Sequence, residues 1–240
     1  MKFNLKSIYN VYLLYSKKND HNMLKYGHPN TQNLRYFDNY ISSYDCERRI
    51  PRWCIHYLNE SNIIPRQKKK FNFRNLENND FIPKKNYYKP YSRGHLVPSG
   101  DFNKDSDKEN TFILEANIIP QNKENNEGIW NRLEFSIRKI IKKYSEIWII
   151  TGPVFIEDNY DIMNYHVLKN GLAVPNYIYK AILFNFSNKM YLNTYLIPNQ
   201  NVGHTDYNKY LINYSYIEKK VGYNLFDKIN KSTVEQNILV

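Results

Sequence analysis

The segment SRGHLVPSGDF, residues 92–102, places a histidine directly after an arginine and a glycine. His95 is the kind of side chain that can take a proton from water near neutral pH, because an unperturbed imidazole has a pKa of about 6.5. Arg93 adds a fixed positive charge, and Gly94 has no side chain to obstruct a substrate. The triplet therefore indicates a general base beside an anion binder, although a single histidine in a loop is more often structural or solvated.

A second group of polar side chains recurs at four-residue intervals, at Asn126, Trp130, Glu134 and Arg138. In a helix this spacing forms a ridge that drifts slowly around the axis. The neutral oxygen of Asn126 suits a hard cation that keeps most of its waters, usually Mg²⁺. Glu134 would lie roughly 12 Å further along the axis, so we expect it to hold a metal-bound water. We expect Arg138 to meet a flanking phosphate.

Each of these residues also has a simpler interpretation. Asn126 could be a helix cap, because asparagine is a preferred capping residue. Glu134 and Arg138 have the spacing of an ordinary surface ion pair. Trp130 could serve only to pack the core, so the chemistry depends on the whole group rather than on one member.

Hydrophobic patterning predicts the elements that would position these groups. A central amphipathic helix carries apolar residues at helical spacing, and it lies between segments typical of strands. This order favours an α+β fold with a mainly antiparallel central sheet flanked by helices. The expected strands lie within residues 26–45, 48–60, 111–120, 146–155, 170–186 and 189–199, the expected helices span residues 122–146 and 206–226, and residues 65–91 form a basic loop.

Length and composition bound the class of protein. The chain has 240 residues, 42% of them hydrophobic, which suits one substantial core. Its 34 Lys and Arg against 23 Asp and Glu give a net charge of +11, which favours polyanionic partners. A genome biased towards A and T would also produce a chain rich in Asn, Lys and Tyr, without any functional reason for the charge. Two cysteines are too few for a disulfide framework, which favours a reducing or organellar compartment.

The N-terminal segment differs from the rest of the chain. Residues 1–19 hold four lysines and no acidic residue, as an organellar presequence would, although biased composition at a frayed terminus explains the pattern equally well. We therefore expect an N-terminal extension over residues 1–23 and a single domain over residues 24–240. No apolar run approaches the roughly 20 residues of a membrane span.

Four segments together resemble the DNA/RNA non-specific endonuclease family, which has the ββα-metal fold. The family pattern is Asp-Arg-Gly-His, then Asn-x-x-Pro-Gln, then Asn-x-x-x-Trp-x-x-Leu-Glu. The resemblance extends from about residue 26 to residue 226. The segments are SRGHLVPSGDF (92–102), TFILEANIIPQ (111–121), NNEGIWNRLEFSIRK (125–139) and WIITGPVF (148–155).

The resemblance implies a role for each matching residue. His95 would be the general base, and Asn126 would be the protein ligand of one Mg²⁺ or Mn²⁺ ion per active site. Glu134 would orient the waters of that ion. The remaining matches are Arg93 near the site, Asn117 as a supporting residue, Arg138 in contact with substrate, and, by a loose alignment, Arg66 as a phosphate binder in the basic loop.

The resemblance also implies a function. It indicates a metal-dependent nuclease that hydrolyses phosphodiester bonds of DNA and RNA, leaves 5′-phosphate and 3′-hydroxyl ends, and forms a homodimer in mitochondria. Ser92 stands where most members have aspartate, and this favours the exonuclease-type subgroup. Ser92 and the basic charge keep open a second interpretation, a nucleic-acid-binding protein that has lost catalysis. A secreted scavenging nuclease fits less well, because neither a signal peptide nor a disulfide framework is evident.

Overall fold

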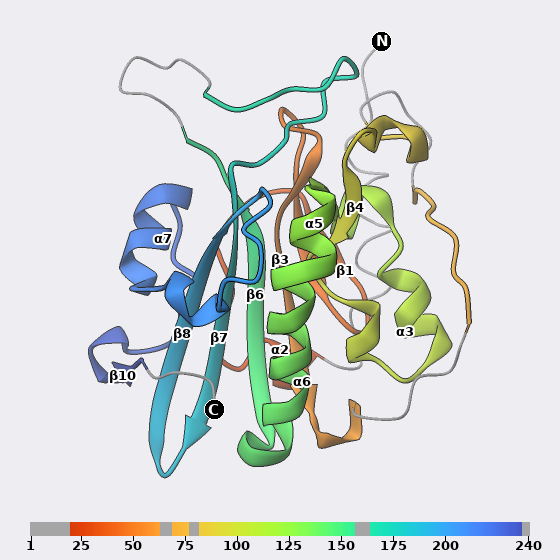
Figure 1. Ribbon diagram of the computed structural model, residues 1–240. Helices are drawn as coiled ribbons and strands as arrows, with labels where there is room; N and C mark the ends of the chain where they lie inside the picture. The colour runs from red at the N-terminus through yellow and green to blue at the C-terminus, as the bar shows by residue number, and fades with distance from the viewer. Residues whose placement is uncertain (1–19, 63–68, 77–81, 157–163, 237–240) are drawn as a thin grey trace.

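The protein is described by a computed structural model, shown in Figure 1, which covers residues 20–62, 69–76, 82–156 and 164–236. A large sheet of eight strands has the order β1-β2-β3-β6-β7-β8-β10, and β9 pairs with β8. All pairings in it are antiparallel except that of β8 with β10. Its strands are β1 (Leu34–Tyr36), β2 (Ile41–Asp45), β3 (Ile50–Asn59), β6 (Glu146–Val154), β7 (Tyr177–Phe186), β8 (Lys189–Pro198), β9 (Leu211–Ile212) and β10 (Val234–Glu235).

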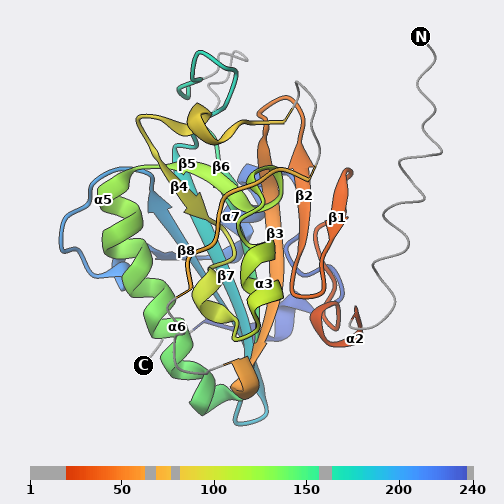
Figure 2. The same ribbon diagram turned by 90° about the vertical axis from the view of Figure 1, so that its right-hand side faces the viewer.

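Helices cover both faces of this sheet. In Figures 1 and 2 the long helix α6 lies on one face and α7 on the other. A second sheet of two antiparallel strands, β4 (Ser92–His95) and β5 (Ile118–Gln121), lies on the α6 side. The α-helices are α2 (Asp20–Met23), α3 (Asp105–Asn110), α4 (Leu114–Asn117), α5 (Lys123–Asn125), α6 (Asn131–Tyr144) and α7 (Tyr214–Val221).

The central strands are apolar on both faces because both faces are covered. In β6, Ile147 and Ile149 join the core beneath α6, whereas Trp148 and Ile150 join the core beneath α7. This alternation is the period of two that a strand imposes on its side chains. The amphipathic pattern predicted for the central helix is confirmed, because Leu133 and Ile137 are among the buried residues of α6.

The predicted α+β class with a mainly antiparallel sheet is confirmed, but three segments differ from the sequence prediction. Residues 114–117 form a helical turn before β5 rather than the first half of a strand. The segment expected as a helix over residues 206–226 begins with a 3₁₀ turn (Tyr207–Tyr210) and β9, and only Tyr214–Val221 is an α-helix. Asn213 caps that helix by accepting a hydrogen bond from the Ser215 N–H, which explains where it begins.

The third difference concerns the helix predicted over residues 122–146, which consists of α5, a π-helical turn and α6. The strand predicted within residues 146–155 is confirmed as β6, and it continues through Gly152 and Pro153. A Cβ atom on Gly152 would lie 2.7 Å from the Arg52 carbonyl oxygen and 2.8 Å from the Tyr179 ring. Glycine therefore lets neighbouring strands approach closely at this position. A search of the described residues finds no helix with the length and apolar character needed to cross a lipid bilayer.

Candidate active site

The β4–β5 hairpin fixes the position of His95 at the end of β4, where His95 pairs with Ile118. Ser92 pairs with Gln121 at the other end of the hairpin. The chain then turns at Asn122 into α5 and α6, so the catalytic motif occupies two strands followed by a helix. This is the ββα order that the sequence resemblance implies.

Gly94 lies beneath the side chain of Gln121. A Cβ atom on Gly94 would be only 2.0 Å from Gln121 Oε1 and 2.6 Å from Gln121 Cβ. The buried Gln121 carboxamide is held there by a 2.7 Å hydrogen bond from its Nε2 to Asn125 Oδ1. The absence of a side chain at residue 94 therefore lets the neighbouring strand, through Gln121, approach closely.

Asn117 anchors the chain that follows His95. Its Oδ1 accepts a 2.7 Å hydrogen bond from the Val97 N–H, and its Nδ2 donates to the carbonyl oxygens of Val97 and Thr111 at 2.9 and 2.8 Å. Its own backbone carbonyl accepts from the Leu96 N–H at 3.0 Å. Asn117 is fully buried and these bonds engage both ends of its carboxamide, so it fixes the backbone that follows His95.

The His95 ring lies between aromatic rings. Its centroid is 5.6 Å from that of Phe73 and 4.9 Å from that of Phe112, the latter edge to face. Burial, and secondly the charge of Arg93, lower the pKa of His95 from 6.5 to about 4. His95 Nε2 is buried and has no hydrogen-bond partner among the described residues. The imidazole is therefore neutral at physiological pH and able to accept a proton.

Arg93 shares an environment with His95. Its guanidinium stacks on Phe73 at 4.3 Å from the ring centroid, and its Nη1 donates a 3.3 Å hydrogen bond to the Lys85 carbonyl. Its buried Nε finds no acceptor within the described part of the chain. Ser92 is half-buried beside it. Arg93 is thus held in place and still has donors available for an anion.

Asn126 begins a widened, π-helical turn and is not the N-cap of this helical segment. The cap is Asn122, whose side chain accepts a 2.9 Å hydrogen bond from the Asn125 N–H. Residues 126–130 then form a π-helical turn around Gly128, whose φ of −99° and ψ of −105° are not helical. In the described structure the Asn126 carboxamide makes no hydrogen bond. A helical turn of this kind is frequently found at functional sites.

Lys180 on β7 joins the hairpin to the helix. Its ammonium group donates to Thr151 Oγ1 at 3.0 Å and to the Leu96 carbonyl at 3.4 Å, directly after His95. It also lies 4.9 Å from the Trp130 ring centroid, one turn beyond Asn126. Burial lowers the pKa of Lys180, and the nearby Glu134 opposes that shift. Lys180 was not identified from the sequence, although a lysine within the apolar run YIYKAILF indicates a buried charge with a partner.

Arg138 occupies the far end of the helical ridge and is paired inside the protein. Its Nη1 lies 2.9 Å from Asp101 Oδ1, and the other oxygen of Asp101 lies 3.0 Å from His56 Nε2. Asp101 and His56 are both buried. The arginine was expected to meet phosphate, and in the structure one of its donors is engaged by Asp101. Asp101 and His56 were not identified from the sequence, although a histidine within the buried strand segment WCIHYL was a usable signal.

Glu134 faces the same network between these two ends. Burial raises its pKa from 4.5 to about 7, with smaller opposing effects from Lys180 and Arg138. The simple interpretation of Glu134 and Arg138 as a surface ion pair is wrong, because Arg138 pairs with Asp101. The ridge from Asn126 to Arg138 therefore faces the hairpin and the loop that follows it.

The two main candidate groups lie on adjacent elements. Strand β4 and helix α5 are side by side in both Figure 1 and Figure 2. Lys180 touches the residue after His95 and the tryptophan one turn after Asn126, which ties the hairpin and the helix together. Arg66, the remaining residue predicted for the site, lies outside the described residues.

The donor set fits a hard cation with few protein ligands. The described residues contain no group of three or more His, Cys, Asp or Glu side chains that could enclose a metal. They do contain the carboxamide of Asn126 without a partner and the carboxylate of Glu134 on the same ridge. Oxygen donors of this kind suit Mg²⁺ or Mn²⁺, which keeps several waters of its own.

Comparison with known proteins adds an independent result. Residues 18–232 match the family described as DNA/RNA non-specific endonuclease. The chain is 33% identical over 189 residues to a zebrafish (Danio rerio) protein named "Nuclease EXOG, mitochondrial", covering 70% of this chain and 53% of that protein. It is 28% identical over 232 residues to "Endonuclease G, mitochondrial" of Caenorhabditis elegans, covering 90% of this chain and 75% of that protein. The chain thus spans about half the length of the EXOG relative.

The fold also matches a solved structure. One chain of "Crystal structure of the EndoG/EndoGI complex: Mechanism of EndoG inhibition" superposes with a TM-score of 0.84 at 26% sequence identity. The superposition covers 92% of this chain and 96% of that chain. The ββα-metal arrangement expected from the sequence is therefore confirmed at the level of the fold.

Proposed function

Because the chain belongs to the DNA/RNA non-specific endonuclease family, we propose that it is a metal-dependent nuclease that hydrolyses phosphodiester bonds in DNA and RNA. The observation that carries this proposal is a pair of groups without protein partners on adjacent elements. His95 Nε2 is an open proton acceptor, and the Asn126 carboxamide is an open oxygen donor. In this proposal a single domain over residues 24–240 contains both groups.

His95 acts as the general base in this mechanism. Its lowered pKa keeps the ring neutral, so it can take a proton from the water that attacks phosphorus. The bond between phosphorus and the 3′ oxygen breaks, so that one fragment of the cleaved strand has a 5′-phosphate and the other has a 3′-hydroxyl. Asn117 and Lys180 hold the backbone on either side of Leu96, and so keep the imidazole in place.

Asn126 would hold one Mg²⁺ or Mn²⁺ ion, and Glu134 would orient its waters. When bound, such an ion stabilises negative charge that develops on the phosphate and on the departing oxygen. Arg93 has a free guanidinium edge for a neighbouring phosphate, and Ser92 lies beside it. Arg138 donates one hydrogen bond to Asp101 and has further donors for substrate. We also propose Arg66 as a phosphate binder.

Substrate binding would depend mainly on phosphate contacts. The net charge of +11 supports binding to both DNA and RNA with little sequence preference. The names of the EXOG and Endonuclease G relatives support a mitochondrial location, for which residues 1–23 would be the targeting segment. We also propose a homodimer, as the sequence resemblance implies.

Digestion of two substrates side by side tests the proposal. Purified protein is incubated with closed circular plasmid and with end-labelled linear DNA, in Mg²⁺ and in Mg²⁺ with excess chelator. Cleavage only without chelator is expected. Nicking of the circle identifies internal cleavage, whereas loss of label with an intact circle identifies action from an end. Binding to both substrates without any cleavage would instead identify a binding protein of the same fold.

A further inference from the structure

A second basic pocket lies away from the catalytic hairpin, on the side of the sheet that α7 covers. Its cavity volume is about 250 Å³. The walls are the turn between β2 and β3, the end of β6, and the last residues of α7 with Tyr223. In Figure 1, α7 and the helix α6 of the active site lie on opposite sides of the sheet. The pocket is therefore separate from the site already described.

The walls of this pocket carry far more positive than negative charge. Arg48, Arg52, Lys219 and Lys220 are all cationic, and Asp45 is the one carboxylate among the lining residues. The remaining lining is aliphatic or aromatic. A pocket with this excess of cations favours an anion with more than one negative charge.

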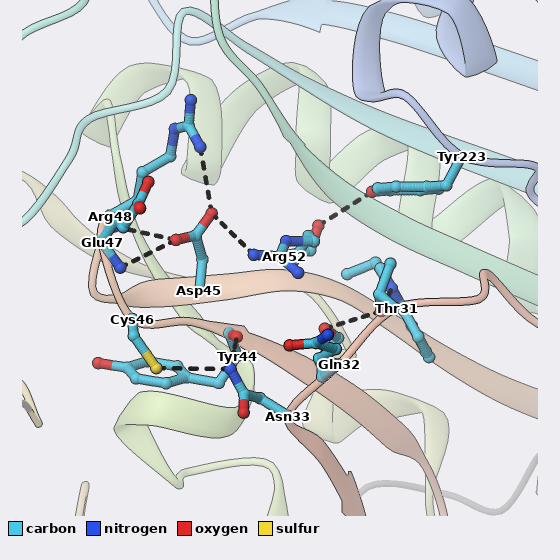
Figure 3. A network of polar contacts seen from close by, with 12 residues as sticks. Thr31, Gln32, Asn33, Tyr44, Asp45, Cys46, Glu47, Arg48, Arg52 and Tyr223 are labelled. Carbon is cyan, nitrogen blue, oxygen red and sulfur yellow. Dashed lines mark hydrogen bonds and ion pairs between the residues drawn. The ribbon is translucent and has the colours of Figure 1, made fainter.

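Asp45 fixes the two arginines rather than neutralising the pocket. Figure 3 shows its carboxylate between them, with Arg48 Nη1 at 3.2 Å and Arg52 Nη2 at 3.5 Å. The same carboxylate also accepts hydrogen bonds from the N–H groups of Glu47 and Arg48, both at 3.1 Å. The Asp45 side chain is only 6% exposed, so the arginines are held against a rigid support.

The two lysines carry positive charge that no acidic side chain neutralises among the described residues. Lys219 and Lys220 are exposed and form no ion pair within the described residues, although Lys220 lies 5.8 Å from the Tyr216 ring centroid. Glu218, the acidic neighbour on α7, is already engaged by Lys231 and by the Leu225 N–H. Two ammonium groups are thus available at the mouth of the pocket.

Contacts across one edge of the molecule connect this pocket to the catalytic hairpin. The Arg48 carbonyl accepts a 3.0 Å hydrogen bond from the Ala173 N–H, and Asn170 Nδ2 donates to the Tyr87 carbonyl at 2.8 Å. Tyr87 belongs to the segment that leads into β4, and other residues of this segment, among them Lys85 and Tyr88, line a second cavity of about 540 Å³. The loop around Asn170 therefore lies between two basic cavities, and the exposed Lys169 is on it.

We propose that the pocket between the β2–β3 turn and α7 is an accessory phosphate-binding site for the nucleic-acid strand that the catalytic hairpin holds. This inference rests on the proposed function, since it assigns the strand to the same substrate. A strand that leaves Arg93 would cross the loop at Lys169 and place a backbone phosphate between Arg52 and the two lysines. Contacts of this type are independent of sequence.

The test compares two lysine pairs that occupy the last turns of two helices. The variant Lys219→Gln/Lys220→Gln removes two positive charges at the mouth of the pocket. The variant Lys142→Gln/Lys143→Gln removes two positive charges from α6 and serves as the control. All four lysines are exposed, so both variants should fold. Binding of labelled single-stranded DNA of 6 and 30 nucleotides is measured in chelator between 50 and 200 mM salt, so that no cleavage occurs.

The pocket variant should bind the 30-nucleotide strand about tenfold more weakly at low salt, with a salt slope reduced by about 1 to 2. Its binding of the 6-nucleotide strand should be unchanged. The α6 variant should stay within about twofold of the parent on both strands. Equal losses in the two variants, or no loss in the pocket variant, would overturn the inference. These binding measurements do not depend on cleavage. A protein that fails to cleave in the digestion experiment would therefore contradict the proposed function, and not the accessory phosphate-binding site.

Discussion

The two ends of the helical ridge that faces the hairpin differ in how well their polar groups are paired. At the Asn126 end, the Asn126 side chain and His95 are half-buried, and His95 Nε2 has no partner among the described residues. At the other end, the half-buried Arg138 pairs with the buried Asp101 at 2.9 Å, and Asp101 contacts the buried His56 at 3.0 Å, although His56 Nδ1 has no partner in the described part of the chain. Both ends lie on one helix face, and the sequence pattern by itself did not distinguish them.

This difference distinguishes the residues that we expect to act on a ligand from those that we expect to stabilise the fold. Each end has a buried polar atom without a partner, which is rare because it costs free energy, but His95 and Asn126 are partly exposed and can be reached by a ligand. Asp101 and His56 are buried, and their contacts hold the structure together. We therefore expect changes at His95 and Asn126 to affect activity more than stability, and changes at Asp101 to do the reverse.

The largest effect is expected from His95→Ala. Loss of a general base typically lowers the rate by about two to four orders of magnitude, and DNA affinity should change little because the ring is neutral. Single-turnover cleavage of a labelled duplex measures the rate, and His204→Ala, which alters an exposed histidine, serves as the control. A His95→Ala protein that cleaves at the parental rate would refute the role of general base.

Asn126→Ala should reduce activity by at least about 100-fold and raise the Mg²⁺ concentration needed for half-maximal activity. The reason is that the carboxamide is the proposed protein ligand of the ion. Cleavage rates over a Mg²⁺ titration measure both effects. Asn131→Ala, at an exposed position on the same helix, should leave the titration unchanged. If both variants respond alike to Mg²⁺, the assignment of the ligand is wrong.

Asp101→Ala tests the paired end of the ridge. Its removal leaves Arg138 without its partner and His56 buried without an acceptor, so the free energy of unfolding should fall by about 3 kcal/mol. Urea denaturation measures the loss. Asp105→Ala, which breaks an exposed pair with Lys69, should cost less than about 1 kcal/mol. Similar losses in the two variants would show that the buried chain contributes no special stability.

The smallest effect concerns the pH dependence of stability. The raised pKa of Glu134 means that the metal-free folded protein keeps a proton that the unfolded chain loses above 4.5. The stability from this group is therefore lost as pH rises towards 7. In chelator, Glu134→Gln should gain about 2 kcal/mol of stability relative to the parent between pH 5 and pH 8. A pH-independent difference between the two proteins would contradict the raised pKa.

The sequence predicted the elements better than it predicted the network between them. Helical spacing placed Asn126, Glu134 and Arg138 on one ridge, because that spacing depends only on local geometry. The partner of Arg138 comes from a distant loop, and no local pattern specifies that contact. His56 and Lys180 were missed for the same reason, since they approach the ridge from two different strands of the large sheet.

Local rules also failed where tertiary contacts decide the backbone. The run TFILEANIIP alternates like a strand at its start, yet residues 114–117 are helical. The buried Asn117 side chain explains this difference, because its bonds to Thr111 and Val97 require the chain to fold back on itself. Such a requirement is not visible in hydrophobic periodicity.

The contact between Gly94 and Gln121 makes two positions behave as one steric unit. A methyl group added at residue 94 would lie 2.6 Å from Gln121 Cβ, so only a glycine at residue 121 would remove the collision. A single substitution of Gly94 should therefore displace the hairpin, whereas smaller residues at position 121 leave Gly94 without a collision. Libraries that vary both positions together are the route by which the glycine could be replaced.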